Sequence, residues 1–329
     1  MVRKLSITFS QAVDGFLLEK RAGRLSPHTL LDYGNAFRKL AEFLAGDPPI
    51  EAITAQDLTA FLADLGGREI APRGIAPRGT RTLSKKSLLN IHTGLSSLWS
   101  WALREDYVQR HEMRLVPRPR PEQRVIIPYS REDVQGMLAA CDVTRMYERP
   151  GKQPCQNTRS TGLRDVAIIH VLLDTGLRAS ELCGLRVKDV NMEQQSLKVL
   201  GKGSKERLVH FGRGTSKAIW RYLASRPDVR QEDALFVSYG QMAAGLTRTG
   251  LRILMGRLGA KAGVTPAANC HRFRHTFAIN FLRNGGDIYA LQMMLGHSTL
   301  DMVKHYLAMA RVDVENEHRR ASPVDNWRL

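Results

Sequence analysis

The sequence predicts a mainly α-helical protein with a small antiparallel β-sheet, divided into an N-terminal helical domain and a C-terminal mixed α+β domain. Three observations predict this class. The chain has 329 residues, which suits two domains that each bury a core of their own. Apolar residues recur at helical spacing in both halves, whereas strand-like runs occur only in the second half. A proline-rich segment separates the two halves.

The N-terminal half is expected to form four amphipathic helices between residues 6 and about 112. Ser26 suits the N-cap of the second helix and Pro27 its first position. Thr54 opens the third helix, and the fourth runs from Ser84 to Asp106. Between the third and fourth helices, the motif IAPRG occurs twice, within residues 70–79. Because no strand pattern interrupts these helices, residues 1–114 are predicted to be a small helical domain.

Residues 115–128 (LVPRPRPEQRVIIP) are predicted to form an extended linker. Proline removes a backbone donor and disfavours helix at the residue before it. The arginines of this segment would suit a strap along a phosphate backbone, and a plainly solvated linker is the alternative.

The remaining residues, 129–329, are predicted to be a mixed domain with a C-terminal tail from about residue 312. Helical periodicity at 131–141 and 164–174 is followed by three short strands, and further helices start at about residue 214. The predicted strands are Val187–Met192, Ser196–Leu200 and Glu206–Phe211, with a hairpin turn at Gly201–Lys205 between the last two. The polar stretch 145–160 is expected to be a surface loop or an insertion.

The charge balance indicates nucleic acid as the partner. Lysine and arginine total 49 against 32 aspartate and glutamate, which gives a net charge of +17. Such a surface attracts polyanions and releases their counterions, so binding should depend steeply on salt. A solubility-tuned surface or a ribosome-associated protein would also carry this charge.

The cysteines and the N-terminus exclude several classes of protein. Four cysteines without a C-x-x-C pair argue against a disulfide framework and against a zinc ribbon or finger. The N-terminus lacks an apolar signal region, and no apolar run approaches the length of a membrane span. We therefore expect a soluble, cytoplasmic protein without a membrane partner.

Arg178 and Lys202 are the first two candidate site residues. Arg178 follows a buried apolar helix in the motif TGLRASEL, and Glu181 could orient it through a charge-assisted hydrogen bond. A second TGLR ends at Arg164, which is predicted to be an ordinary residue at a helix start. Lys202 lies in the hairpin turn and could donate a proton, with Lys205 as the competing candidate. A structural arginine and a solvated turn lysine are the alternatives for these two residues.

The other candidates come later in the chain. His271 and Arg274 share one face near a helix N-terminus, which favours phosphate binding. A metal pair of His271 with His275 is the rival, which the local positive charge disfavours. His297 follows Leu-Gly, and Tyr306 comes nine residues later on the next predicted helix. Taken alone, such a tyrosine is more often a packing residue.

Together these strings resemble the tyrosine recombinase/integrase family, most of all its two-domain Xer-type members. The family's ordered pattern of Arg, Lys, His-x-x-Arg, Leu-Gly-His and Tyr is met here by Arg178, Lys202, His271, Arg274, His297 and Tyr306. The flanking strings GKGSKERLVHF and LQMMLGHSTLDMVKHY also agree. The resemblance covers nearly the whole chain and implies a core-binding domain over 1–114 and a catalytic domain over 129–329.

The resemblance implies DNA cleavage and rejoining through a 3′-phosphotyrosyl intermediate on Tyr306. Arg178 and Arg274 would clamp the phosphate, and His297 would add a hydrogen bond to it. His271 would accept or shuttle the tyrosine proton, and Lys202 would protonate the leaving 5′-oxygen. No ATP or other cofactor is expected, because the covalent link stores the bond energy. No metal is expected either, because Lys202 would do the leaving-group work that Mg²⁺ does elsewhere.

The resemblance also implies double-stranded DNA with specific recombination sites, a tetramer of recombinases on two sites, and possible accessory proteins or a partner recombinase. The tail from about residue 312 would dock on a neighbouring protomer or fray. Chromosome-dimer resolution and integration of a mobile element are both open. The alternatives are a type IB topoisomerase or a related resolvase, and a DNA-binding regulator that does not cut.

Overall fold

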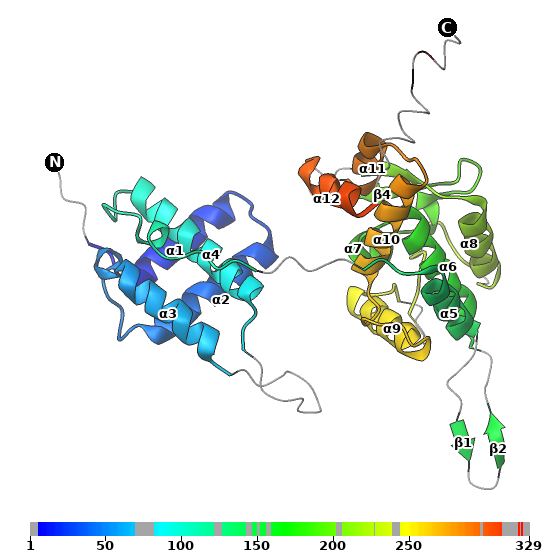
Figure 1. The fold of residues 1–329 in the computed structure, drawn as a ribbon, viewed down its shortest axis with the longest axis horizontal. Helices are drawn as coiled ribbons and strands as arrows, with labels where there is room; N and C mark the ends of the chain where they lie inside the picture. Colours follow the sequence, from blue (N-terminus) through cyan, green and yellow to red (C-terminus); the bar gives the residue numbers. More distant parts are fainter. Residues whose placement is uncertain are drawn as a thin grey trace. The chain divides into compact units, whose positions relative to one another are not determined.

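The computed structural model describes residues 6–69, 82–121, 127–142, 147–149, 152–155, 159–201, 206–226, 228–238, 244–296, 299–310, 322 and 324. The chain divides into two compact units, Met1–Arg124 and Val125–Leu329 (Figure 1). The IAPRG repeat, Lys202–Lys205, His297 and most of the C-terminal tail lie outside the described residues.

The first unit is a helical bundle without a β-sheet in its described part. Its elements are α1 (Phe9–Ala22), α2 (Pro27–Phe43), η1 (Ile50–Ala52), α3 (Ala55–Gly67), α4 (Lys85–Arg104) and η2 (Glu112–Arg114). The expected helix starts at Ser26, Thr54 and Ser84 are confirmed, since each side chain accepts a hydrogen bond from a backbone N–H of the first turn. These caps satisfy donors that a helix start leaves unpaired.

Aromatic side chains fill the core of this unit. Trp99 and Phe61 are fully buried, and Phe16 packs edge-on against Phe37 with ring centroids 5.5 Å apart. This core is built mainly from helix faces, with Ile53, Val108 and Val116 added from connecting segments, so the unit holds together by apolar burial.

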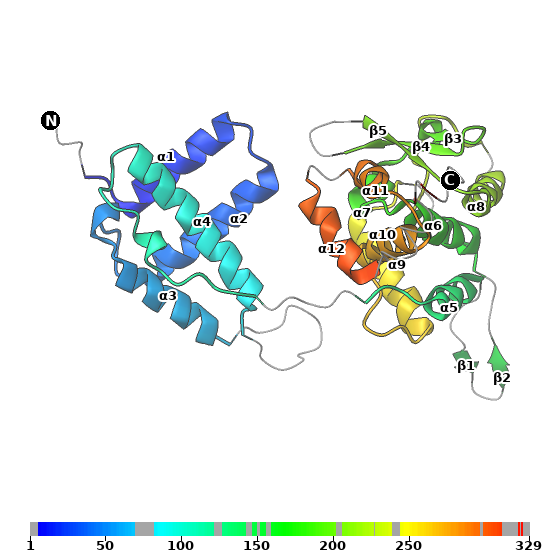
Figure 2. The same cartoon turned by 45° about the horizontal axis from the view of Figure 1, so that its top comes forward.

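The second unit is mainly helical with a small sheet, which confirms the predicted fold class. Its helices are α5 (Arg131–Asp142), α6 (Gly162–Thr175), α7 (Ala179–Gly184), η3 (Val187–Asp189), α8 (Arg213–Ala224), α9 (Arg248–Lys261), α10 (Cys270–Arg283), α11 (Ile288–Leu295) and α12 (Asp301–Ala310). Helix α10 runs through the middle of the unit and packs against α6 and α12 (Figure 2).

The sheet has the antiparallel order β3-β4-β5, formed by β3 (Val190–Asn191), β4 (Ser196–Leu200) and β5 (Glu206–His210). The strand predicted over Val187–Met192 is therefore partly wrong. Residues 187–189 form a 3-10 turn whose backbone bonds run to the segment at 231–233 instead of to a neighbouring strand.

The predicted loop at 145–160 is also partly wrong, because β1 (Tyr147–Arg149) and β2 (Lys152–Cys155) pair as an antiparallel hairpin. Pro150 and Gly151 stand between the two strands in the sequence, and such a pair favours a turn. Of the helices that the structure describes, none has both the length and the apolar character needed to cross a membrane.

Candidate active site

Arg178 is positioned by a glycine that ends α6. Gly176 has φ of +61°, and a Cβ there would lie 2.5 Å from Phe277 Cδ1, so the left-handed turn and the close approach of α10 both require glycine. The chain turns sharply and Arg178 becomes the N-cap of α7. Its backbone N–H donates to Glu181 Oε2 at 2.8 Å, and its Nη1 donates to Oε1 at 2.9 Å.

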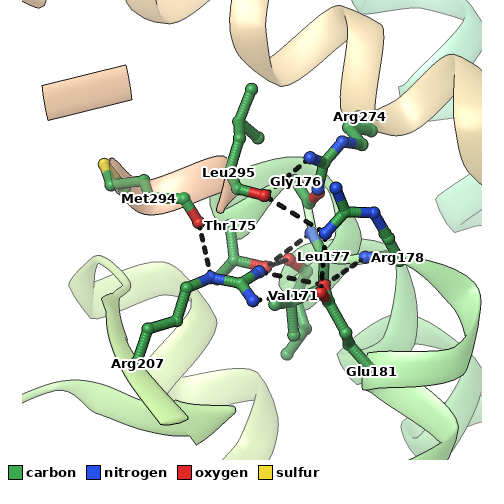
Figure 3. A network of polar contacts seen from close by, with 10 residues as sticks. All are labelled: Val171, Thr175, Gly176, Leu177, Arg178, Glu181, Arg207, Arg274, Met294 and Leu295. Carbon is green, nitrogen blue, oxygen red and sulfur yellow. Dashed lines mark hydrogen bonds and ion pairs between the residues drawn. The ribbon is translucent and has the colours of Figure 1, made fainter. Parts of the chain in front are cut away.

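Glu181 joins this turn to the sheet. Arg207 on β5 donates from Nη1 to Glu181 Oε1 and from Nη2 to Oε2, each at 3.0 Å (Figure 3). Burial by itself would raise the pKa of Glu181, but hydrogen bonds from Arg207 and Arg178 outweigh it and leave the pKa below its ordinary value. The carboxylate is therefore ionised and holds both guanidinium groups in fixed orientations.

The C-terminal end of α11 contacts the same arginines (Figure 3). Leu295 O accepts from Arg274 Nη2 at 2.7 Å and from Arg178 Nη1 at 3.3 Å, and Met294 O accepts from Arg207 Nε at 3.0 Å. These carbonyls carry the negative end of the helix dipole, which favours cations. Gly296, with φ of +63°, ends α11, and a Cβ there would lie 3.2 Å from Arg207 Nη1.

The cluster carries an excess of positive charge. Arg178 and Arg207 both donate to the carboxylate of Glu181, while Arg274 donates to backbone carbonyls and interacts with Glu181 only electrostatically. Burial, followed by repulsion from Arg178, lowers the pKa of Arg274 to about 10, so this guanidinium is still charged at neutral pH. Arg178 keeps 33% of its side chain exposed and lines a pocket of about 410 Å³ together with Gly201. Such a site can bind an anion and stabilise further negative charge on it.

Tyr306 lies on α12, which packs against α10, and only 5% of it is exposed. Its Oη is 2.8 Å from Nδ1 of His275, and the two rings are 5.6 Å apart. Burial raises the pKa of the Tyr306 phenol, while the positive charges of Arg274 and Arg178 oppose this rise. The tyrosine thus lies within the electrostatic influence of the arginine cluster.

The structure brings Arg178, Glu181 and Arg274 together, and it connects them electrostatically to Tyr306. His271 is exposed at the start of α10, one turn before His275. Lys202 and His297 lie outside the described residues, but Gly201 lines the Arg178 pocket and Gly296 abuts Arg207. No group of three His, Cys, Asp or Glu side chains within the described ranges is arranged to hold a metal ion.

Two polar residues of this site, Arg207 and His275, were not predicted from the sequence. Arg207 had a detectable signal, because it precedes the buried Val209 by two positions and so falls on the inward face of its strand. His275 was considered only as a metal ligand paired with His271, and nothing in the spacing pointed to Tyr306.

Comparison with known proteins identifies the family. Residues 137–311 match the model of the phage integrase family. The chain is 32% identical over 303 residues to the tyrosine recombinase XerC of Pelobacter propionicus, covering 91% of this chain and 90% of that protein. It is 28% identical to the tyrosine recombinase XerC of Bacillus subtilis, covering 91% of both chains.

Solved structures share the fold. The Tn1549 transposon integrase in complex with circular intermediate DNA superposes with a TM-score of 0.69 at 20% identity, covering 94% of this chain and 100% of that chain. A lambda integrase dimer bound to a core site superposes with a TM-score of 0.64 at 16% identity, covering 90% of this chain and 97% of that chain. The chain belongs to the phage integrase family and is a tyrosine-type site-specific recombinase.

Proposed function

We propose that this recombinase cuts and rejoins double-stranded DNA through Tyr306, whose Oη attacks a phosphodiester and forms a 3′-phosphotyrosyl intermediate. The observation that supports this most is the buried tyrosine beside a cluster of three arginines, two of which bind the carboxylate of Glu181. A phosphodiester is an anion that repels a nucleophile and gains negative charge during attack. The surplus charge of this cluster opposes both effects.

Each remaining candidate has a role in this reaction. Arg178 and Arg274 bind the non-bridging oxygens, while Glu181 holds Arg178 in place. His297 adds a hydrogen bond to the same phosphate. Lys202, which follows the pocket residue Gly201, protonates the leaving 5′-oxygen. His271 shuttles the tyrosine proton.

The covalent link conserves the energy of the broken bond, so we expect no ATP to be required for rejoining. Because Lys202 protonates the leaving oxygen, we expect no metal to be required either. Residues 1–114 bind DNA, residues 115–128 cross its backbone as a linker, and residues 129–329 carry the chemistry. The transposon and lambda integrases with this fold were solved on DNA, and one as a dimer on its core site. We infer that the protein acts in the cytoplasm as a tetramer on two recombination sites. An accessory protein or a partner recombinase can take part in this assembly.

Covalent capture on genomic DNA tests this function. The purified protein is incubated with DNA from its own organism and is then denatured. The DNA that stays attached to the protein is sequenced. The proposal predicts attachment at a small number of related sites. Tyr306→Phe should bind these sites and form no adduct, whereas Tyr289→Phe, which changes an exposed tyrosine on α11, should form adducts as the unaltered protein does. Adducts that survive Tyr306→Phe would refute the assignment.

The same substrates separate the alternatives. A type IB topoisomerase relaxes a supercoiled plasmid that lacks any of the mapped sites, while a recombinase requires them. A regulator that does not cut would bind the sites without a covalent adduct. The family match and the relatives named recombinases favour neither alternative.

A further inference from the structure

The hydroxyl of Tyr306 is directed at a histidine outside the family's motif. In the described part of the chain, Tyr306 Oη has His275 Nδ1 as its hydrogen-bond partner, at 2.8 Å. The two side chains come from α12 and α10, which pack together. The contact therefore joins two residues that lie 31 positions apart in the chain. His275 directly follows Arg274, so the phosphate clamp and this histidine share one helical turn.

The burial of Tyr306 restricts where its proton can go. With 5% of the residue exposed, bulk water has little access to the phenol, and a proton lost on attack needs an acceptor inside the protein. The arginine cluster cannot accept it, because guanidinium groups stay protonated. His271, the residue assigned to this proton by the motif, is exposed one turn earlier on α10. His275 is half-buried and already within hydrogen-bonding distance.

We propose that His275 is a catalytic residue whose Nδ1 takes the proton of Tyr306 during cleavage and returns it during rejoining. This inference rests on the function proposed above. As the bond between Oη and phosphorus forms, the Oη–H bond breaks and its proton moves to Nδ1, which gives an imidazolium. The bond between phosphorus and the 5′-oxygen breaks, and the leaving oxygen takes a proton from Lys202. Rejoining reverses each transfer, and His271 shuttles the proton between His275 and solvent.

The chemistry of imidazole suits this role. One nitrogen of a neutral imidazole can accept a proton and later return it, which is why histidine commonly acts as a proton shuttle. Arg274 and Arg178 stabilise the phenolate that the transfer creates, and the phosphate in the transition state offsets the new positive charge. A correctly placed general base contributes about 10²–10⁴-fold to a rate.

The test uses the full-length protein and a nicked duplex that carries a site mapped by covalent capture. His275→Asn keeps an acceptor oxygen near the position of Nδ1 but cannot take a proton. His275→Phe keeps an aromatic ring beside Tyr306 and guards against a defect of folding. Both variants should cleave at least about 10²-fold more slowly in a single turnover, with unchanged DNA affinity and unfolding temperature. His210→Asn, which changes an exposed histidine on β5, is the matched control and should cleave normally.

A second substrate distinguishes removal of the Tyr306 proton from protonation of the leaving 5′-oxygen. Sulfur in place of the bridging 5′-oxygen gives a leaving group that departs without a proton. The defect of Lys202→Ala should therefore disappear on this substrate, while the defect of both His275 variants should persist. A His275→Asn variant that cleaves as fast as the unaltered protein, or faster, would overturn the proposal, and so would rescue by sulfur. If the unaltered protein forms no adduct on any substrate, the proposed function itself fails.

Discussion

Two clusters of arginine and carboxylate lie in the second unit, and both start from the same four letters, TGLR. In the first copy, Arg164 donates to Asp165 Oδ1 from Nε at 2.9 Å and from Nη2 at 2.7 Å, and Arg159 contacts Oδ2 at 2.5 Å. In the second copy, Arg178 and Arg207 share Glu181. Both carboxylates are buried, and each accepts hydrogen bonds from two arginines.

The two clusters differ in how exposed their arginines are and in whether positive charge remains uncompensated. Arg164 and Arg159 expose only 9% and 12% of their side chains, and Arg164 also donates to Val237 O at 2.7 Å. This cluster is closed and holds the start of α6 in place. At the other cluster, Arg178 is 33% exposed beside a pocket, and Arg274 adds a third charge. An arginine–carboxylate cluster thus becomes a candidate anion site when it has surplus charge and an opening.

The largest expected effect comes from the open cluster. Arg178→Ala removes a guanidinium aimed at the phosphate, so single-turnover cleavage of a mapped site should fall about 10²–10³-fold. The free energy of unfolding should change far less, since the side chain is partly exposed. Cleavage kinetics and urea unfolding on the same preparation check this. Cleavage at the normal rate would show that the two TGLR copies do not differ in function.

The closed cluster should behave in the opposite way. Asp165→Asn leaves two buried arginines without their carboxylate, which should lower the free energy of unfolding by about 3–5 kcal/mol. Cleavage per folded molecule should stay normal below the unfolding transition. Urea unfolding followed by circular dichroism measures the loss. An Asp165→Asn protein that is stable but inactive would contradict a purely structural role.

Arg207 supports the open cluster but is not among the residues that line its pocket. Arg207→Lys keeps the charge but loses the paired hydrogen bonds to Glu181 and the bond to Met294 O. Cleavage should slow about tenfold, on the order of one charged hydrogen bond. As a control, Arg213→Lys changes an exposed arginine at the start of α8 and should have no effect. If Arg207→Lys equals Arg178→Ala in effect, Arg207 touches the phosphate itself.

The smallest expected effect is the pH dependence contributed by Glu181. Because its folded pKa lies below the ordinary value of 4.5, the ionised carboxylate favours the folded state. Its contribution is fully present above the unfolded pKa and is lost as the pH falls through the folded pKa. The stability difference from Glu181→Gln should therefore shrink on acidification from neutral pH to below 4.5. A difference that stays constant over this range would contradict an ionised Glu181.

The parts of the fold that the sequence predicted are those set by local chemistry. Ser26, Thr54 and Ser84 cap helices as expected, because capping depends only on the neighbouring three residues. The strands predicted at 196–200 and 206–211 are found at 196–200 and 206–210. The hairpin of β1 and β2 was missed, since its strands are brief and polar and carry no alternating pattern.

In the candidate site, only contacts between residues close together in the sequence could be predicted. The bond between Arg178 and Glu181 joins residues three apart and was expected, and the structure contains it. The contacts of Arg207 with Glu181 and of His275 with Tyr306 span 26 and 31 residues and depend on how strands and helices pack.

In the proposed reaction, Tyr306 forms the covalent bond to DNA. Adducts trapped on a nicked duplex are digested with nuclease and protease, and the peptide that retains a nucleotide is identified by mass spectrometry. We predict a single modified peptide with the nucleotide on Tyr306, linked through its 3′-phosphate. A nucleotide on Tyr289 or on any other side chain, or a 5′-linkage, would contradict the account.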